Sequence, residues 1–230
     1  MKSKFVGPMA ALALTVAFAG GASATPIYTV DAWIGNLKAD HIGGTNADKP
    51  LPSPAADAHF TIAGPIDWIT SKGANLVQDF LTKDGAVALP AIGGYTSPSA
   101  SYATLASFLA ASMSKGGDAY SAFFHITGAY SSAANYAGTI RHDDGASLYI
   151  DNDATKIFGS APETSAITTS FVLPSGSHNF DLYYVEGNGA PSVLNINFPS
   201  SVVPTPEPAA IALFGIGLLG LGLARRRRHA

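Results

Sequence analysis

The sequence predicts a mainly β protein: an antiparallel β-sandwich with two short helices, between an N-terminal signal peptide and a C-terminal transmembrane helix. From residue 120 onward, apolar residues alternate with polar or small ones, which is the period of half-buried antiparallel strands. The alternating sets are Phe124 and Ile126; Leu148 and Ile150; Phe171 and Leu173; Phe180, Leu182 and Tyr184; and Leu194, Ile196 and Phe198. Turns rich in Gly, Asp and Asn separate these sets at short intervals, and this spacing favours a sandwich over an α/β fold.

Residues 1–24 have the composition of a secretory signal peptide. Lys2 and Lys4 precede an apolar stretch, and Ala22-Ser23-Ala24 fits a small-residue cleavage site. Cleavage after Ala24 would leave Thr25 as the first residue of the exported body. An uncleaved membrane anchor is the alternative.

Residues 25–119 are predicted to form the N-terminal part of the body, with loops and short helices. Prolines interrupt residues 40–65, so this stretch is expected to be irregular, with at most short strands. Helical spacing of apolar residues predicts one short helix around residues 76–81 and another around residues 105–113, each followed by glycine. Residues 90–98, which lie between them and contain two adjacent glycines, are predicted to form a loop. The sandwich core is expected in residues 120–200.

Three segments follow the body: a linker at 201–208, an apolar run at 209–224 and a basic tail at 225–230. A helix over the run would be about 24 Å long at about 1.5 Å per residue, slightly short for a bilayer core of about 30 Å. The arginines that follow would stay on the cytoplasmic side of the membrane; they are Arg225, Arg226, Arg227 and Arg228. A buried core helix is the less favoured alternative, because a soluble domain rarely ends an uncharged segment in four like charges.

Pro206-Glu207-Pro208, the apolar run and the arginine cluster together resemble the PEP-CTERM sorting signal of exported bacterial proteins. This resemblance implies processing near the Pro-Glu-Pro sequence by a membrane protease-transpeptidase of the exosortase type. The expected partners at this end are therefore the membrane, through the helix at 209–224, and that processing enzyme. The expected location is the cell surface or the extracellular space, with a membrane anchor before processing.

Charge and cysteine content exclude several functions. The formal net charge is −3, and six of the thirteen basic residues lie in the signal peptide and the tail, so the body is clearly acidic. Nucleic acid binding is not expected, because it needs a basic surface to neutralise phosphates. The absence of cysteine excludes disulfides, thiolate metal sites and cysteine nucleophiles. The body of about 180 residues is expected to form one domain.

Two adjacent carboxylates, Asp143 and Asp144, precede a predicted strand in the sequence Asp-Asp-Gly-Ala-Ser-Leu-Tyr-Ile-Asp. Their charges repel each other, and a hard cation such as Ca²⁺, which takes six to eight oxygen ligands, would turn this repulsion into a binding site. The alternative is a turn in which one carboxylate accepts hydrogen bonds from main-chain N–H groups and Gly145 supplies a positive φ. The spacing alone favours the turn.

Four segments in order resemble the protective-antigen-type domain and its fibro-slime relatives, over roughly residues 120–198. They are Phe124–Gly128, Ile140–Asp151, Leu173–His178 and Tyr184–Leu194. That family is a β-sandwich found in bacterial toxins, glycosidases, adhesins and matrix proteins. In its fungal adhesins, an Asp-Asp pair joined by a cis peptide helps to hold Ca²⁺, which orders sugar hydroxyls. The resemblance therefore implies Asp143 and Asp144 as metal ligands, Ca²⁺ as cofactor and a polysaccharide as partner.

Other ligand-binding residues are proposed on chemistry alone. Glu186 and Asn188, in the sequence Glu-Gly-Asn-Gly, carry the carboxylate and amide oxygens that Ca²⁺ prefers, although Asn188 between two glycines is more often a turn residue. Tyr149, Tyr183 and Tyr136 are expected on the polar faces of their strands, where a tyrosine ring can stack on a sugar. Pairing across the sheet is the favoured interpretation for these tyrosines.

No catalytic motif is present, so enzyme activity is not expected. The sequence therefore predicts an exported binding protein of the cell surface or extracellular matrix, with Ca²⁺-assisted binding of an exopolysaccharide as the specific hypothesis. The first alternative is a structural biofilm or matrix protein without a ligand site. The second is an accessory domain linked to glycoside hydrolysis, which would need a catalytic domain.

Overall fold

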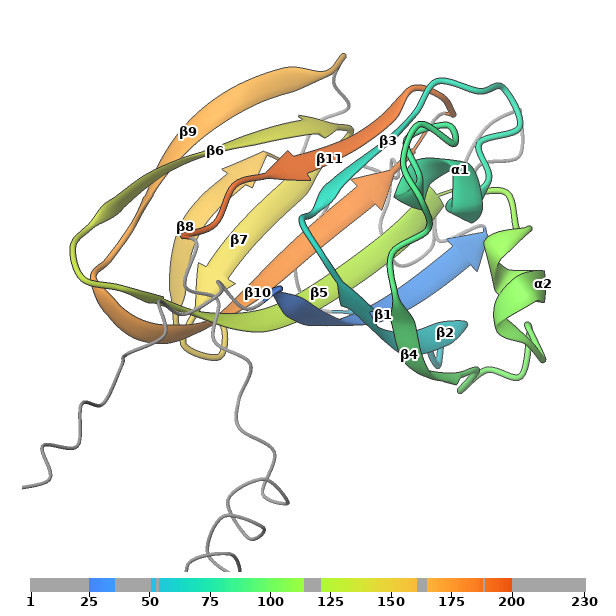
Figure 1. Ribbon diagram of the computed structural model, residues 1–230, viewed down its shortest axis with the longest axis horizontal. Coiled ribbons are helices and arrows are strands. Elements are labelled where there is room, and N and C mark those ends of the chain that lie inside the picture. Colours follow the sequence, from blue (N-terminus) through green and yellow to red (C-terminus); the bar gives the residue numbers. More distant parts are fainter. Residues whose placement is uncertain are drawn as a thin grey trace, which may run out of the picture.

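The computed structural model describes residues 25–35, 51–52, 54–113, 121–160, 165–187 and 189–199, which form two antiparallel sheets packed face to face (Figure 1). The predicted sandwich with two short helices is thus confirmed. The predicted signal peptide (1–24), linker (201–208), transmembrane helix (209–224) and basic tail (225–230) lie outside the described residues. Within the part that the structure describes, no helix has the length and apolar content needed to cross a bilayer.

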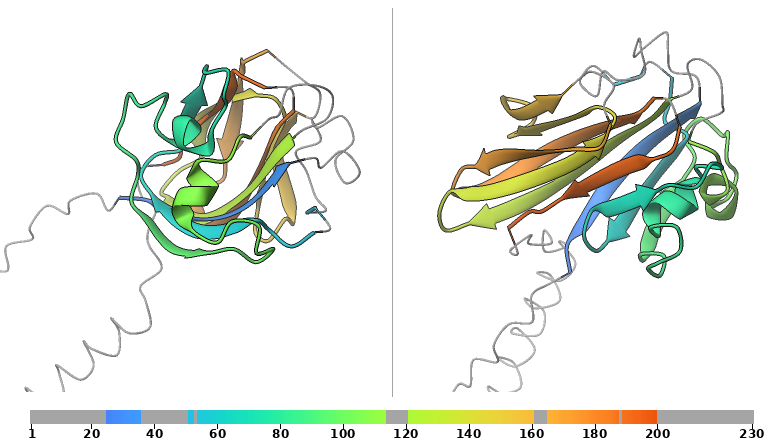
Figure 2. Two further views of the ribbon diagram at one scale, coloured as in Figure 1. Left: turned by 90° about the vertical axis from the view of Figure 1, so that its right-hand side faces the viewer. Right: turned by 90° about the horizontal axis from the view of Figure 1, so that it is seen from above.

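The strands and helices have the following bounds: β1 (Ile27–Gly35), β2 (Ala58–Ala63), β3 (Asp67–Thr70), α1 (Val77–Leu81), β4 (Ile92–Thr96), α2 (Leu105–Leu109), β5 (Ser121–Ser132), β6 (Tyr136–Asp143), β7 (Ala146–Ile150), β8 (Thr155–Ser160), β9 (Ile167–Leu173), β10 (Gly176–Glu186) and β11 (Ser192–Ile196). The large sheet has seven strands in the order β4-β2-β1-β5-β10-β7-β8, and the small sheet has four in the order β3-β11-β6-β9. Figure 2 shows the two layers from further directions, with α1 and α2 beside each other at one end.

The N-terminal part of the body is built into both sheets. β1 lies between β2 and β5, with Val30 opposite Phe60 on one side and Ile126 on the other. Inward residues Val30 and Ala32 are fully buried, because every second side chain of a strand faces the same side. The large sheet therefore includes strands from residues 25–119, where the sequence predicts mainly loops, short helices and at most short strands.

Residues 90–98 were also predicted as a loop, and this prediction is wrong over β4. β4 pairs with β2 at the margin of the large sheet. Its Gly93 lies so close to β2 that an added Cβ would be 3.1 Å from Oγ1 of Thr61. Glycine therefore marks a close approach of two strands here, and the glycine pair does not end the strand.

Both predicted helices are confirmed as short elements. α1 buries Val77, Phe80 and Leu81, and α2 buries Phe108 and Leu109. α2 begins after Thr104, whose side chain accepts a hydrogen bond from the main-chain N–H of Ser107, while Ser107 bonds back to Thr104. This reciprocal cap satisfies main-chain N–H groups that a helix start leaves unpaired.

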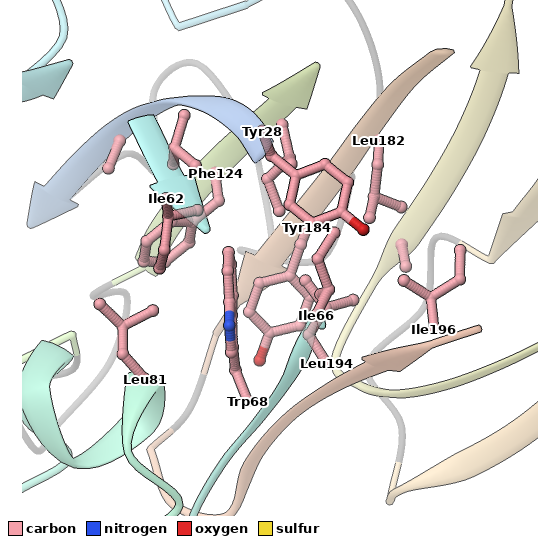
Figure 3. Close-up of a cluster of buried hydrophobic side chains, with 14 of the residues drawn as sticks. Tyr28, Ile62, Ile66, Trp68, Leu81, Phe124, Leu182, Tyr184, Leu194 and Ile196 are labelled. Atoms are coloured by element: carbon pink, nitrogen blue, oxygen red, sulfur yellow. The ribbon is translucent and has the colours of Figure 1, made fainter. Parts of the chain in front are cut away.

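The main core lies between the sheets and is rich in aromatic rings. Figure 3 shows Trp68, Leu194 and Ile196 from the small sheet facing Phe124, Leu182 and Tyr184 from the large sheet. Phe80 of α1 completes this cluster, with its ring centroid 5.8 Å from that of Trp68 and 5.5 Å from that of Tyr184, on which it stacks at 15°. α1 therefore supports the end of β10, where the candidate site begins.

Candidate functional site

The Asp143–Asp144 pair lies where the chain crosses from one sheet to the other. β6 of the small sheet ends at Asp143, and β7 of the large sheet begins at Ala146. The peptide bond between Asp143 and Asp144 is cis, as the resemblance to the adhesin pair implied. Both side chains are buried, with 6% and 4% of their residue surfaces exposed. The crossing thus carries two carboxylates into the end of the sandwich.

Both main-chain carbonyls of the pair accept hydrogen bonds from buried side chains. The Tyr184 hydroxyl donates to the Asp143 carbonyl at 2.6 Å, and Nδ1 of His142 lies 2.5 Å from the Asp144 carbonyl. Because a carbonyl can only accept, Nδ1 of His142 carries the proton. Burial lowers the pKa of His142, which favours this neutral ring. The N–H of Gly187 donates to Oδ2 of Asp144 at 2.8 Å, so the turn is held by its main chain and by one carboxylate.

Glu186 ends β10 beside this turn and is 1% exposed. Its Oε1 accepts from the N–H of Gly189 at 2.8 Å, and Oε2 accepts from the Tyr184 hydroxyl at 3.3 Å. The structure therefore brings Glu186 to the Asp143–Asp144 pair, as proposed from the sequence. Asn188 lies outside the described residues.

Burial and mutual repulsion make this a strained electrostatic cluster. Burial, and then the charge of Asp144, raise the pKa of Asp143 to about 6, while a main-chain hydrogen bond from Ala166 and the charge of Arg141 offset part of the shift. Burial and then the charge of Asp144 raise the pKa of Glu186 to about 8. Raised values mean that the cluster favours a proton or another positive charge over its fully ionised state. We call Asp143, Asp144 and Glu186 the carboxylate cluster.

The donor chemistry of the carboxylate cluster fits a hard cation. Asp143 and Asp144 would hold Ca²⁺ directly, since carboxylate oxygens are its preferred protein ligands. Glu186 is engaged with Gly189 and Tyr184, and would act mainly through its charge. Among the described residues, no group of three or more His, Asp or Glu side chains is arranged to hold a metal ion. The remaining ligands would therefore be main-chain oxygens, water or a bound hydroxyl.

Tyr149 does not lie at this site. It projects from the outer face of the large sheet and is 7% exposed, in a second cluster composed of Trp33, Ala56, Phe123, Tyr149, Tyr183 and Val185. Its ring meets that of Tyr183 edge to face at 5.9 Å, and the Lys156 ammonium lies 5.3 Å from its centre. The contact with Tyr183 and the small exposed fraction support pairing across the sheet for Tyr149 rather than stacking on a sugar. Tyr183 is likewise buried, and Tyr136 packs against the main core.

Sequence reasoning missed the two residues whose side chains hold the turn. Tyr184 was assigned only to the core alternation, yet its hydroxyl reaches the turn from the same strand face as Glu186, two residues later. That spacing was a usable signal, because a tyrosine among buried apolar residues needs a partner for its hydroxyl. His142 gave a weaker signal, since only its position next to Asp143 was informative.

Comparisons with known proteins bear on the tail and on the fold. The PEP-CTERM protein-sorting motif matches residues 204–228, which confirms that part of the sequence prediction and indicates an exported, surface-associated protein processed at its C-terminal end. Similar solved structures include a PA14 sugar-binding domain from an RTX adhesin (TM-score 0.46, 17% identity, 75% of this chain and 88% of that chain). Another is the PA14 domain of an antifreeze protein (TM-score 0.46, 16% identity, 76% of this chain and 84% of that chain). A GH31 alpha-xylosidase from Xanthomonas citri is also similar (TM-score 0.32, 10% identity, 78% of this chain and 22% of that chain). No curated protein sequence matches the chain.

Proposed function

We propose that this protein binds polysaccharide at the cell surface through a Ca²⁺ ion held by Asp143 and Asp144. The observation that carries the proposal is the carboxylate cluster: two adjacent aspartates and Glu186, all buried, at one crossing between the sheets. The sorting motif at 204–228 supports a location where extracellular polysaccharide is available.

The proposed role of each group follows from its chemistry. The two aspartates supply negative oxygens to the cation, and Glu186 adds to the attraction once the cation replaces its proton. Because Ca²⁺ takes six to eight oxygens, a two-carboxylate site leaves positions that a pair of neighbouring sugar hydroxyls can fill. The exopolysaccharide of the cell offers such pairs along its whole length.

The first test is a thermal melt of residues 25–203 in excess calcium and in chelator. A cation that binds only the folded state stabilises it by about 2.7 kcal/mol at one hundred times its dissociation constant. For a domain of this size, that corresponds to a rise of roughly 5–10 °C in the midpoint. We expect this rise in the wild type and its loss in both Asp143→Asn and Asp144→Asn.

Asp151→Asn is the matched control, because Asp151 follows the far end of β7 and its side chain is half exposed beside His178. This variant is expected to keep the calcium response. Identical melts with calcium and chelator would instead favour a structural matrix protein, since the hydrogen bonds from Tyr184, His142 and Gly187 already hold the turn. A glycan array read in calcium and in chelator then tests the sugar: binding that survives in Asp143→Asn would contradict the proposed site.

Tyr184→Phe is expected to weaken calcium binding about tenfold. The variant keeps the ring stacked on Phe80 but removes the hydroxyl that holds the Asp143 carbonyl. The lost bond leaves a buried acceptor unpaired, at a cost of about 1–3 kcal/mol, and releases one side of the turn. Isothermal titration with calcium measures the effect.

Tyr130→Phe provides the comparison, since Tyr130 is also buried and donates to the Pro174 carbonyl at 3.3 Å, away from the cluster. It is expected to lower stability without changing calcium affinity. Equal calcium affinities in both tyrosine variants would show that the Tyr184 hydroxyl does not position the turn.

A further inference from the structure

β9 is the last strand of the small sheet and pairs, among the described strands, with β6 alone (Figure 1). β8 approaches it from the large sheet but forms no ladder with it. A strand at the margin of a sheet presents unpaired N–H and C=O groups that can pair with another chain. Proteins usually protect such margins with charges, bulges, prolines or very short strands.

The other three marginal strands of the sandwich carry such protection. β3 has four residues, and its Asp67 forms an ion pair with Lys83. The β4 ladder is irregular between His59 and Thr61, and the β8 ladder is irregular after Leu148. β8 also carries Lys156. Each of these margins therefore resists the addition of another strand.

β9 lacks every one of these devices. Its sequence is Ile-Thr-Thr-Ser-Phe-Val-Leu, with no charge, glycine or proline over seven residues. It pairs with β6 in unbroken register from Leu173 to Ile167. Its outward side chains Thr168, Ser170 and Val172 are exposed, and Val172 is 56% exposed. β9 is thus a regular, uncharged and accessible edge on an otherwise acidic body.

We propose that β9 pairs antiparallel with β9 of a second copy of this chain, joining two four-stranded sheets into one of eight strands. The absence of charge favours a second copy, because two acidic bodies repel each other elsewhere on their surfaces but not along this strand. A pair centred on Ser170 sets Thr168 of one copy opposite Val172 of the other. Such β-branched cross-strand pairs stabilise sheets.

Pairing of β9 also arranges the proposed binding sites. Ile167 at the start of β9 lies opposite His142, directly beside the Asp143–Asp144 turn. Antiparallel pairing therefore places the two turns toward opposite ends of the joined strands, which at about 3.3 Å per residue span roughly 23 Å. If the proposed sugar binding is correct, the dimer can hold one polysaccharide at two points or link two chains.

Light scattering of the full chain in detergent micelles tests the pairing itself. We expect a concentration-dependent dimer. Val172→Lys is expected to weaken the dimer affinity at least tenfold, because each β9 strand then brings a lysine into the dimer interface. Val87→Lys is the matched control, since Val87 is a similarly exposed valine in the loop after α1, away from β9. A wild-type monomer, or a dimer that Val172→Lys leaves intact, would overturn the proposal.

The cysteine-free chain allows a second, independent readout. Residues directly opposite in an antiparallel pair have Cα atoms about 4.5–5.5 Å apart, which a disulfide can bridge. Ser170→Cys is expected to form a disulfide-linked dimer, whereas Ser101→Cys, on an exposed loop, is not. Equal yields of disulfide-linked dimer in both variants would show that β9 is not the dimer interface. Because Asp143→Asn should dimerise like the wild type, failure of calcium binding and failure of dimerisation can be told apart.

Discussion

In chelator, the free energy of unfolding is expected to fall by several kcal/mol between pH 5 and pH 8, and Glu186→Gln is expected to remove most of that fall. Folding raises the pKa of Glu186 from an ordinary value of 4.5 to about 8 through burial and repulsion by Asp144. Between these values the folded state binds more protons than the unfolded chain. The stability is therefore complete below about pH 4.5 and is lost as the pH rises toward 8.

The size of this fall follows from the size of the shift. A pKa difference from 4.5 to about 8 corresponds to about 5 kcal/mol at 1.36 kcal/mol for each pH unit. Asp143, whose pKa is raised to about 6, acts in the same direction over a lower range. Calcium should reduce the fall, because a bound cation stabilises the ionised cluster. The stabilisation by calcium should thus be larger at pH 8 than at pH 5.

Denaturant unfolding at pH 5 and pH 8, in chelator and in calcium, measures these differences. Asp79→Asn is the control, because Asp79 forms an ion pair with Lys72 outside the core, where such pairs contribute little. It is expected to leave the pH dependence unchanged. If Glu186→Gln retains the wild-type fall in chelator, Glu186 is not its source, and the electrostatic account of the carboxylate cluster is wrong.

The strands that could be predicted are those whose burial shows in their own sequence. β5, β7, β9, β10 and β11 each direct apolar residues at alternate positions into the main core, so the period of two is visible without knowledge of their neighbours, although the other residues of β7 are buried as well. β1, β2 and β4 were missed for a different reason. Prolines, glycines and the nearby cleavage site obscure their patterns, and pairing with strands distant in sequence determines them. Tertiary pairing of this kind overrides local preference.

The same limit explains the outcome at the candidate site. Asp143, Asp144 and Glu186 were predictable, because oxygen chemistry points to all three and the family resemblance also points to Asp143 and Asp144. The burial of Tyr149 was not, since its ring packs against Tyr183 of another strand, in a cluster that Phe123 and Trp33 extend across further strands. The strand period correctly predicts that the Tyr149 side chain points away from the main core. A side chain on that outer face can still be buried, because aromatic rings from neighbouring strands pack against one another there.

Phe80→Ala is expected to destabilise the fold by about 3–5 kcal/mol, the cost typical of removing a buried phenylalanine. Phe80 is fully buried, and its ring contacts those of Trp68, Phe124 and Tyr184, which come from three different strands. The free energy of unfolding in denaturant measures this cost, and Val87→Ala in the exposed loop after α1 should change it by less than about 0.5 kcal/mol. A cost below about 1 kcal/mol for Phe80→Ala would mean that α1 is not part of the core.

Phe80→Ala is also expected to weaken calcium binding, because the stacked Phe80 ring fixes the ring of Tyr184 and thereby the hydroxyl that holds the Asp143 carbonyl. Phe180→Ala separates this effect from lost stability, since Phe180 is equally buried but stacks on Phe198, whose centroid lies 4.3 Å away. Both variants should unfold more easily, while only Phe80→Ala should lower the calcium affinity measured by titration at a temperature where both are folded. Equal affinities would show that the turn keeps its geometry without support from α1. A selective loss would mean that a helix preceding residue 120 helps to position the Asp143–Asp144 pair, so the site depends on both parts of the body.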